Sequence, residues 1–153
     1  MADVTITAGP ALARYALRAR LPEAIEAATG FRLPRAISDQ VDGIAQLGPA
    51  EWYARLPVGQ AIADAPGIAV VDVGERAVAI VVEGADAWRV LAAGCPLDLE
   101  VFAVGRAART IYETVEIVLF RVSATRFEID VWRSFSPWIS QALAAAAAAL
   151  APA

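Results

Sequence analysis

The sequence predicts one α+β domain, in which a mainly antiparallel sheet carries helices packed on one face. Three observations support this fold class. The chain has 153 residues, of which 58% are hydrophobic, and this suits a single core of ordinary size. Its second half runs strand, strand, helix, strand, strand, strand, helix, and hairpins beside helices are typical of α+β domains. No internal repeat or linker divides the chain, so residues 1–153 are expected to form one domain.

The first half of the chain carries the weaker signals. Pro22 suits the first turn of a helix, and Gly30 suits a helix end. Pro66 and Gly67 stop the last element of this half. The predicted elements are a strand at 14–18, a helix at 21–28, a loop at 33–35, a strand at 44–47, a strand or helix at 51–56 and a short helix at 58–65.

β-Branched runs make the second half clearer. Gly94 closes its first helix, and Pro96 prevents any continuation. Alanine is the strongest helix former, so the alanine run at 144–149 should extend the last helix, with fraying before Pro152. The predicted elements are a hairpin of strands 68–73 and 77–82 around a turn at 74–76, a helix at 84–93, strands at 108–112, 115–122 and 126–132, and a final helix that begins at Ser134 or Ser136.

The composition removes most catalytic chemistry. The chain has no histidine, lysine or asparagine, and one cysteine. Without histidine there is no Ser-His or Cys-His relay, and without lysine there is no Schiff base. One cysteine without histidine cannot form a tetrahedral zinc site, so no metal is expected. A site built only from carboxylates and arginines stays open, but the chain is otherwise expected to lack a complete active site.

Charge and hydropathy indicate where the protein acts. The net charge of −4 and the pI near 4.8 argue against nucleic-acid binding. Although the mean hydropathy is +0.52, no apolar run reaches the roughly 18 residues of a membrane-spanning helix. No signal peptide is expected, and one cysteine fits a reducing compartment. We therefore expect a soluble cytoplasmic protein. Its surplus of apolar residues fits either a partner interface or a GC-rich genome.

Two residues after the predicted helix 84–93 are candidates for chemistry. Cys95 follows the helix end, where the helix dipole disfavours a thiolate, so a buried structural cysteine is expected. Asp98 and Glu100 could form a carboxylate pair. The commoner role of such an aspartate is to pin the loop by accepting backbone N–H bonds, and this is the interpretation we favour.

A second set of candidates lies around the first of the last three strands. Arg106 and Arg109, with Thr110, could hold a carboxylate or a phosphate. A surface ion pair, or a salt bridge to another chain, is the commoner use of such arginines. With lysine absent, arginine must also fill every basic surface role, which weakens the inference of a ligand.

Acidic residues fall inside otherwise apolar strands. Glu128 and Asp130 flank Ile129 and therefore share one face of their strand, while Ile129 and Val131 share the other. We expect Glu128, Asp130 and Glu116 to lie on a solvated face, unless a partner covers that face.

Three aromatic residues lie close together near the last predicted helix. Trp132, Phe135 and Trp138 surround Arg133 and Ser134. Aromatic residues beside arginine are typical of interface anchors. They are equally typical of a core where a strand turns into its covering helix, and the sequence leaves both alternatives open.

A series of short motifs runs through the chain, beginning with LGPAEW at 47–52 and VDVGER at 71–76. GCPLDL followed by RT and RSF is a specific combination. Its residues are Gly94, Cys95, Pro96, Leu97, Asp98, Arg109, Thr110, Arg133, Ser134 and Phe135. The series resembles the gamma subunit of heterotetrameric sarcosine oxidase, and the resemblance covers roughly residues 47–143. Residues 1–43 contribute little to it, and residues 144–153 are an alanine-rich tail.

The resemblance implies a fold similar to the folate-binding domain of glycine-cleavage aminomethyltransferase. It also implies an accessory subunit of an oxidoreductase complex in sarcosine catabolism. Such a complex demethylates sarcosine oxidatively to glycine and passes the one-carbon unit to tetrahydrofolate. Its alpha, beta and delta subunits are the expected partners and are expected to hold FAD, FMN, NAD and tetrahydrofolate. No cofactor is expected in this chain.

The resemblance also suggests an alternative, in which the domain keeps a weak folate or pterin site. Its candidate residues are Glu116, Arg109 and Arg133. Aminomethyltransferases carry an asparagine near the strand at 126–132, whereas this chain has none. This departure argues against the folate alternative.

Overall fold

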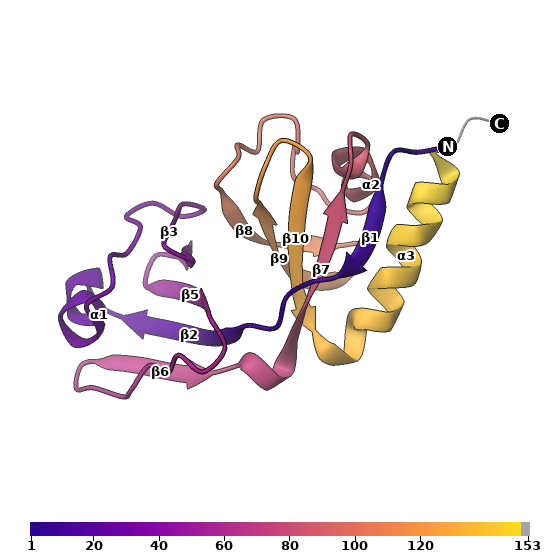
Figure 1. Ribbon diagram of the computed structural model, residues 1–153. Coiled ribbons are helices and arrows are strands. Elements are labelled where there is room, and N and C mark those ends of the chain that lie inside the picture. Colours follow the sequence, from indigo (N-terminus) through magenta and orange to yellow (C-terminus); the bar gives the residue numbers. More distant parts are fainter. Residues whose placement is uncertain (151–153) are drawn as a thin grey trace.

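In the computed structural model, which describes residues 1–150, ten strands form two antiparallel sheets that lie against each other (Figure 1). The order is β1-β7-β10-β9-β8 in sheet A and β3-β4-β5-β2-β6 in sheet B. The strands of sheet A are β1 (Thr5–Ala8), β7 (Ala77–Glu83), β8 (Ala107–Tyr112), β9 (Val115–Arg121) and β10 (Arg126–Trp132). Those of sheet B are β2 (Ala13–Ala19), β3 (Gln40–Val41), β4 (Ile44–Gly48), β5 (Glu51–Leu56) and β6 (Ile68–Asp72).

Helices cover the outer face of each sheet (Figure 1). They are α1 (Pro22–Thr29), α2 (Ala87–Ala92) and α3 (Ser136–Ala149), with short 3₁₀ turns η1 (Gly74–Arg76) and η2 (Arg133–Phe135). Leu91 of α2 and Leu143 of α3 pack into the core of sheet A. Ile25 of α1 packs into the core of sheet B. The layers are therefore helices, sheet A, sheet B and helix.

Strand alternation directs side chains to the two sides of each sheet. In β5, Trp52 and Ala54 belong to the core beneath α1, while Tyr53 points toward sheet A. In β9, Leu119 belongs to the core beneath α2 and α3, while Phe120 points toward sheet B. The space between the sheets is therefore lined by alternate residues of both.

The structure confirms the α+β class and most of the predicted elements. The strands predicted at 14–18, 44–47, 108–112, 115–122 and 126–132 correspond to β2, β4, β8, β9 and β10. The ambiguous segment 51–56 is strand β5. Helix α1 ends at Gly30 with a left-handed φ of 76°, and the alanine run continues α3 to Ala149. The expected fraying before Pro152 falls outside residues 1–150.

The predicted hairpin of strands 68–73 and 77–82 is wrong. β6 pairs with β2 in sheet B, whereas β7 pairs with β1 and β10 in sheet A. The chain crosses between the sheets at η1, instead of folding back in a tight turn. Residue periodicity identifies a strand but not the strand with which it pairs. The two strands were expected to pair with each other because they are close in the sequence. The expected single sheet is accordingly two sheets.

The predicted helix at 58–65 is also wrong, because this segment is irregular. Gly59 has a φ of +90°, outside the range of a right-handed helix. Ile62 is its one buried residue, so the segment lacks the apolar face that stabilises a short helix. The helix predicted at 84–93 is shorter than expected, since α2 begins at Ala87. Strands β1 and β3 were not predicted.

Candidate functional site

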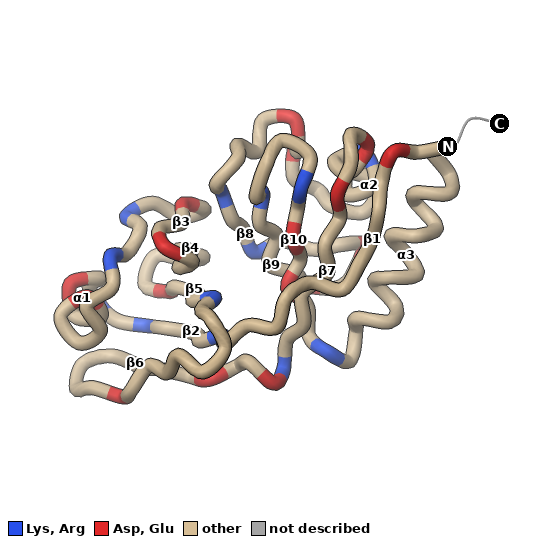
Figure 2. Tube along the Cα trace, viewed as in Figure 1, with Lys and Arg blue, Asp and Glu red and all other residues tan. Residues whose placement is uncertain are grey.

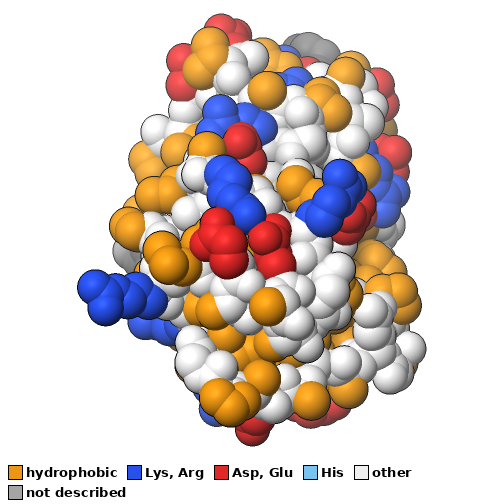
Figure 3. Space-filling model, turned by 90° about the vertical axis from the view of Figure 1, so that its left-hand side faces the viewer, with side chains coloured by type: hydrophobic (Ala, Val, Ile, Leu, Met, Phe, Trp, Pro, Cys, Tyr) orange, Lys and Arg blue, Asp and Glu red, His pale blue; other side chains and the backbone are white. Residues whose placement is uncertain are grey.

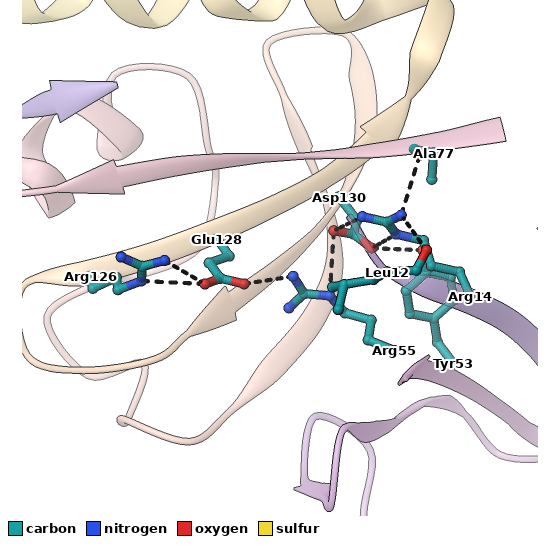
Figure 4. Close-up of polar contacts among 8 residues, drawn as sticks. All are labelled: Leu12, Arg14, Tyr53, Arg55, Ala77, Arg126, Glu128 and Asp130. Carbon is teal, nitrogen blue, oxygen red and sulfur yellow. Dashed lines mark hydrogen bonds and ion pairs between the residues drawn. The ribbon is translucent and has the colours of Figure 1, made fainter. Parts of the chain in front are cut away.

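A network of charged side chains lies between the two sheets (Figure 4). Asp130 of β10 is its centre. Arg14 of β2 donates from Nε to Asp130 Oδ2 at 2.6 Å, and the Tyr53 hydroxyl of β5 donates to the same oxygen at 2.8 Å. The side chains of Arg14 and Asp130 are only 3% and 1% exposed. This buried pair therefore joins strands that belong to different sheets.

Glu128 continues the network along β10. It accepts a hydrogen bond from Arg55 at 2.6 Å and one from Arg126 at 3.0 Å. The guanidinium carbon of Arg55 also lies 4.1 Å from the ring centroid of Phe120, a cation–π arrangement. Arg55 thus contacts both an anion and an aromatic ring of sheet A.

These contacts correct the expected environment of Glu128 and Asp130. The two carboxylates share one face of β10, as predicted, and Ile129 and Val131 lie in the core on the other. The face of Glu128 and Asp130 is not solvated, however, because sheet B covers it and both residues are buried. Arg14 and Arg55, which neutralise it, were not among the predicted site residues.

The network shifts the pKa values of its members. Burial alone would raise the pKa of Glu128, but the hydrogen bonds from Arg55 and Arg126 outweigh it and leave this pKa below its ordinary value. Burial opposes the charge on Arg14, yet the hydrogen bond and the charge of Asp130 raise its pKa. Burial, followed by the negative charge of Asp130, raises the pKa of Tyr53. Glu128 and Arg14 are therefore held in their charged forms, and Tyr53 in its neutral form.

A cleft of about 310 Å³ opens beside this network and is the candidate site. Tyr53 and Asp130 line it together with charged residues of both sheets and one aromatic residue, namely Arg18, Glu51, Arg76, Arg109, Glu116 and Trp132. A larger cleft of about 670 Å³ runs along residues 8–15, but alanine, glycine and proline make up much of its lining. The smaller cleft is the one that contains Asp130 and Tyr53 of the network together with Arg109 and Glu116.

Two of the three predicted folate-site residues meet in this cleft. Arg109 Nε lies 3.7 Å from Glu116 Oε1. Arg109 also donates from both terminal nitrogens to the two carboxylate oxygens of Glu51, at 3.1 Å for Nη1 to Oε2. That hydrogen bond raises the pKa of Arg109 and lowers the pKa of Glu51. The third residue, Arg133, lines a neighbouring hollow and donates to the carbonyl of Glu75 at 3.1 Å.

The fit to a folate or pterin is therefore poor. At about 310 Å³ the cleft is near the lower end of ligand pockets. Arg109 is occupied by Glu51, and the buried Glu128 and Asp130 are occupied by arginines. A ligand would have to break these pairs. Within residues 1–150, no group of three or more histidine, cysteine, aspartate or glutamate side chains is arranged to hold a metal.

The GCPLDL motif has structural contacts. Cys95 is buried, as expected, with Sγ 3.8 Å from the hydroxyl of Thr110. A Cβ at Gly94 would lie 2.8 Å from the ring of Tyr112, so only glycine fits this close approach. Asp98 accepts the backbone N–H of Glu100 at 3.1 Å, the loop-pinning role that the sequence favoured. Leu97 packs against the core of sheet A.

The remaining predicted residues lie on the surface. The residues of the RSF motif, Arg133, Ser134 and Phe135, form η2 and are exposed. Trp132 and Trp138, on either side of η2, are also exposed. Arg106 donates to the carbonyls of Ser38 and Ile37. Among residues 1–150, no helix is both long and apolar enough to cross a membrane.

No protein-family model and no curated protein sequence matches this chain. Solved structures similar to it include an oxidase and an aminomethyltransferase. The first is heterotetrameric sarcosine oxidase from Corynebacterium sp. U-96 in complex with pyrrole 2-carboxylate. The similarity to a chain of that structure has a TM-score of 0.86 at 28% identity and covers 98% of this chain and 86% of the other.

The second similar structure is the glycine cleavage system aminomethyltransferase T from Bartonella henselae. Its TM-score is 0.66 at 15% identity, over 93% of this chain and 45% of the other, so the likeness concerns the fold alone. Both similarities include the first third of the chain, where the motifs contributed little. The chain therefore has an aminomethyltransferase-like fold, and nearly its whole length is similar to one chain of a heterotetrameric sarcosine oxidase.

Proposed function

We propose that the chain is the accessory gamma-type subunit of a heterotetrameric sarcosine oxidase and carries no catalytic residue of its own. The observation that carries this proposal is the similarity over 98% of the chain to a chain of such an enzyme, at a TM-score of 0.86. The motif series GCPLDL, RT and RSF supports the same subunit.

The contacts between the sheets support a non-catalytic role. A catalytic acid or base needs a group that can reach a substrate and change its protonation state. Here Asp130 and Glu128 are buried and paired with arginines, and Glu51 is bound by Arg109. Each of these carboxylates binds an arginine of the opposite sheet, which supports a structural role for them.

The proposal assigns the chemistry to other chains. The alpha, beta and delta subunits would hold FAD, FMN, NAD and tetrahydrofolate, and the complex would convert sarcosine to glycine in the cytoplasm. This chain would stabilise their assembly.

Production of the alpha, beta and delta subunits with and without this chain tests the proposal. We expect loss of the assembled complex and of sarcosine oxidation when the chain is omitted. Full assembly and full activity without it would contradict the proposal.

A paired variant separates assembly from catalysis. Arg109→Ala with Glu116→Gln removes two of the exposed charges of the cleft, and Arg32→Ala is a control in a surface ion pair elsewhere. In the assembled complex, both should keep the kcat of the wild type. A selective fall of kcat in the cleft variant would show that the cleft takes part in the reaction.

The alternative function is weak binding of a folate or pterin in the cleft. One observation favours it: Arg76 and Trp132 line the cleft, and within residues 1–150 Arg76 forms no ion pair or side-chain hydrogen bond. A guanidinium and an indole can hold a carboxylate and a flat ring. Calorimetric titration of the chain with tetrahydrofolate tests this, and the absence of heat at high micromolar ligand would exclude it.

A further inference from the structure

The turn between β10 and α3 presents an unusual surface. Trp132, Phe135 and Trp138 are 38%, 45% and 41% exposed. None of the seven residues 132–138 is buried, and six of them are exposed. Large aromatic side chains are rare on a surface unless they contact something, because each exposes a large apolar area to water. This turn therefore differs from the rest of sheet A, whose aromatic residues lie inside.

Among the described residues, two arginines beside this turn form no ion pair. Arg76, Trp132 and Arg133 line one open hollow. Within residues 1–150, Arg133 donates only to the carbonyl of Glu75, and Arg76 forms no ion pair. Glu75 is the nearest carboxylate in the sequence and lines the larger cleft together with Arg133. Arg133 binds its backbone carbonyl, however, and within residues 1–150 no ion pair joins the two side chains. The hollow thus carries two positive charges that no ion pair within residues 1–150 neutralises.

Most other arginines of the chain are neutralised internally. Nine of the thirteen form ion pairs within residues 1–150, namely Arg14, Arg18, Arg32, Arg35, Arg55, Arg89, Arg106, Arg109 and Arg126. On the face turned to the viewer in Figure 3, basic and acidic side chains accordingly lie side by side. Unpaired positive charge beside exposed aromatic rings is therefore a local feature, and it is unexpected in a chain of net charge −4.

We infer that Arg76, Trp132, Arg133, Phe135 and Trp138, which we name the aromatic–arginine patch, bind another protein chain that presents carboxylates beside apolar side chains. Tryptophan and arginine are the residues that contribute most to protein interfaces. Carboxylates of the partner would complete the charge balance at Arg76 and Arg133. The inference rests on the proposed function, for which it specifies the docking surface and the chemistry of the partner subunit.

The net charge favours a protein over other anionic partners. A nucleic acid or an anionic membrane attracts a broadly basic surface, and the negative charge of the whole chain opposes both. A partner subunit can instead match two charges locally. Helix α3 has no charged residue and forms an uninterrupted neutral coil in Figure 2. The carboxylates of the partner are therefore expected over η1 and η2, and its apolar residues over the start of α3.

The test measures binding of this chain to the complex of the alpha, beta and delta subunits. Two variants change the patch, Trp138→Ala and the double charge reversal Arg76→Glu with Arg133→Glu. Each should weaken binding on the order of 10- to 30-fold, as expected for loss of an interface anchor. The double reversal should lose most at low salt, because the new carboxylates repel those of the partner.

Arg20→Glu is the matched control, since Arg20 is also exposed and forms no ion pair within residues 1–150. It should bind within about twofold of the wild type, as most surface substitutions do. Thermal unfolding of the isolated variants should match the wild type, because all the changed side chains are exposed. Loss of binding in the patch variants alone supports the inference.

Other results would overturn it in distinguishable ways. Equal binding by all variants would refute the role of the patch and leave the proposed function intact. No binding by the wild type would refute both the role of the patch and the proposed function. Self-association of the isolated chain that Trp138→Ala abolishes would identify a second copy as the occupant. Binding of the wild type, but not of the double reversal, to vesicles containing phosphatidylserine would identify a lipid surface.

Discussion

The two faces of β10 are both buried, but different interactions stabilise them. Toward the helices, Phe127, Ile129 and Val131 pack into an apolar core with residues of α2 and α3. Toward sheet B, Glu128 and Asp130 bind arginines through charged hydrogen bonds. One seven-residue strand thus belongs to an apolar interface on one side and to an ionic interface on the other.

The difference between the apolar face and the ionic face of β10 suggests which interactions fix the position of one sheet against the other. An apolar core tolerates changes of side chain if volume is kept, so it specifies geometry loosely. A buried carboxylate requires its partner at hydrogen-bond distance, because an unpaired buried charge costs several kcal/mol. We infer that the apolar face supplies most of the stability, while the ionic face fixes the position of sheet B against sheet A.

The largest expected effect comes from removing the central carboxylate. Asp130→Ala leaves Arg14 buried without an anion and should lower the free energy of unfolding by about 3–5 kcal/mol, measured by urea denaturation. Arg32→Ala breaks an ion pair whose two side chains are largely exposed, so it should cost about 0–1 kcal/mol. Equal effects of the two variants would refute the contrast between the ionic interface and the surface.

A smaller effect is expected from the hydroxyl that also binds Asp130. Tyr53→Phe keeps the ring but removes the 2.8 Å hydrogen bond to the carboxylate. A hydrogen bond to a charged group contributes about 1.5–3 kcal/mol, and the variant should lose about this much stability. Tyr15→Phe is a control on the neighbouring strand, since Tyr15 belongs to the core beneath α1. A loss as large in the control would show that the ionic network is not the cause.

The apolar face should be the more tolerant one. Ile129→Val shortens a fully buried side chain by one methylene and should cost about 0.5–1.5 kcal/mol. Asp130→Asn, which changes as little in volume, should cost more than this, because two arginines lie beside the lost charge. A larger loss of stability in Ile129→Val than in Asp130→Asn, measured by chemical denaturation, would contradict the greater tolerance of the apolar face.

The smallest effect should appear only in acid. The pKa of Glu128 is lowered in the folded protein, so its contribution to stability is complete above the unfolded pKa of about 4.3 and is lost as the pH falls through the folded value. The free energy of unfolding should therefore be level near neutral pH and decrease below about pH 4. Glu128→Gln should make this decrease shallower, and an unchanged acid profile would contradict the assignment.

The sequence predicted most strands of sheet A and the face of β10 to which each of its side chains points. Alternation correctly placed Glu128 and Asp130 on one face of a strand and Ile129 and Val131 on the other, because a strand turns each successive side chain to the opposite side. The proximity of Arg109 and Glu116 also follows locally, since β8 and β9 form a hairpin.

The rest depends on contacts between distant parts of the chain. The solvated environment expected for Glu128 and Asp130 was wrong because Arg55 and Arg14 lie 73 and 116 residues away in the sequence. No local pattern connects these residues. Arg14 in β2 and Arg55 in β5 were nevertheless a usable signal. Each alternates with apolar residues along its strand and therefore points to the face of sheet B that lies against sheet A, where it binds a carboxylate. Long-range pairing likewise decided that β6 belongs to sheet B.

The crossing of the chain between the sheets has a consequence for the speed of folding. β1 pairs with β7 and β2 pairs with β6, although each pair is far apart in the sequence. Asp130 and Arg14 are separated by 116 residues. All strands of sheet B lie within residues 13–72, whereas sheet A combines residues 5–8 with residues 77–132. Sheet A and the ion pair between Arg14 and Asp130 can therefore be completed only after β10 has been synthesised. Chains dominated by such distant contacts fold slowly, typically in milliseconds to seconds. During that interval the arginines of sheet B and the carboxylates of sheet A are expected to stay hydrated, because burying either charge without its partner would cost several kcal/mol.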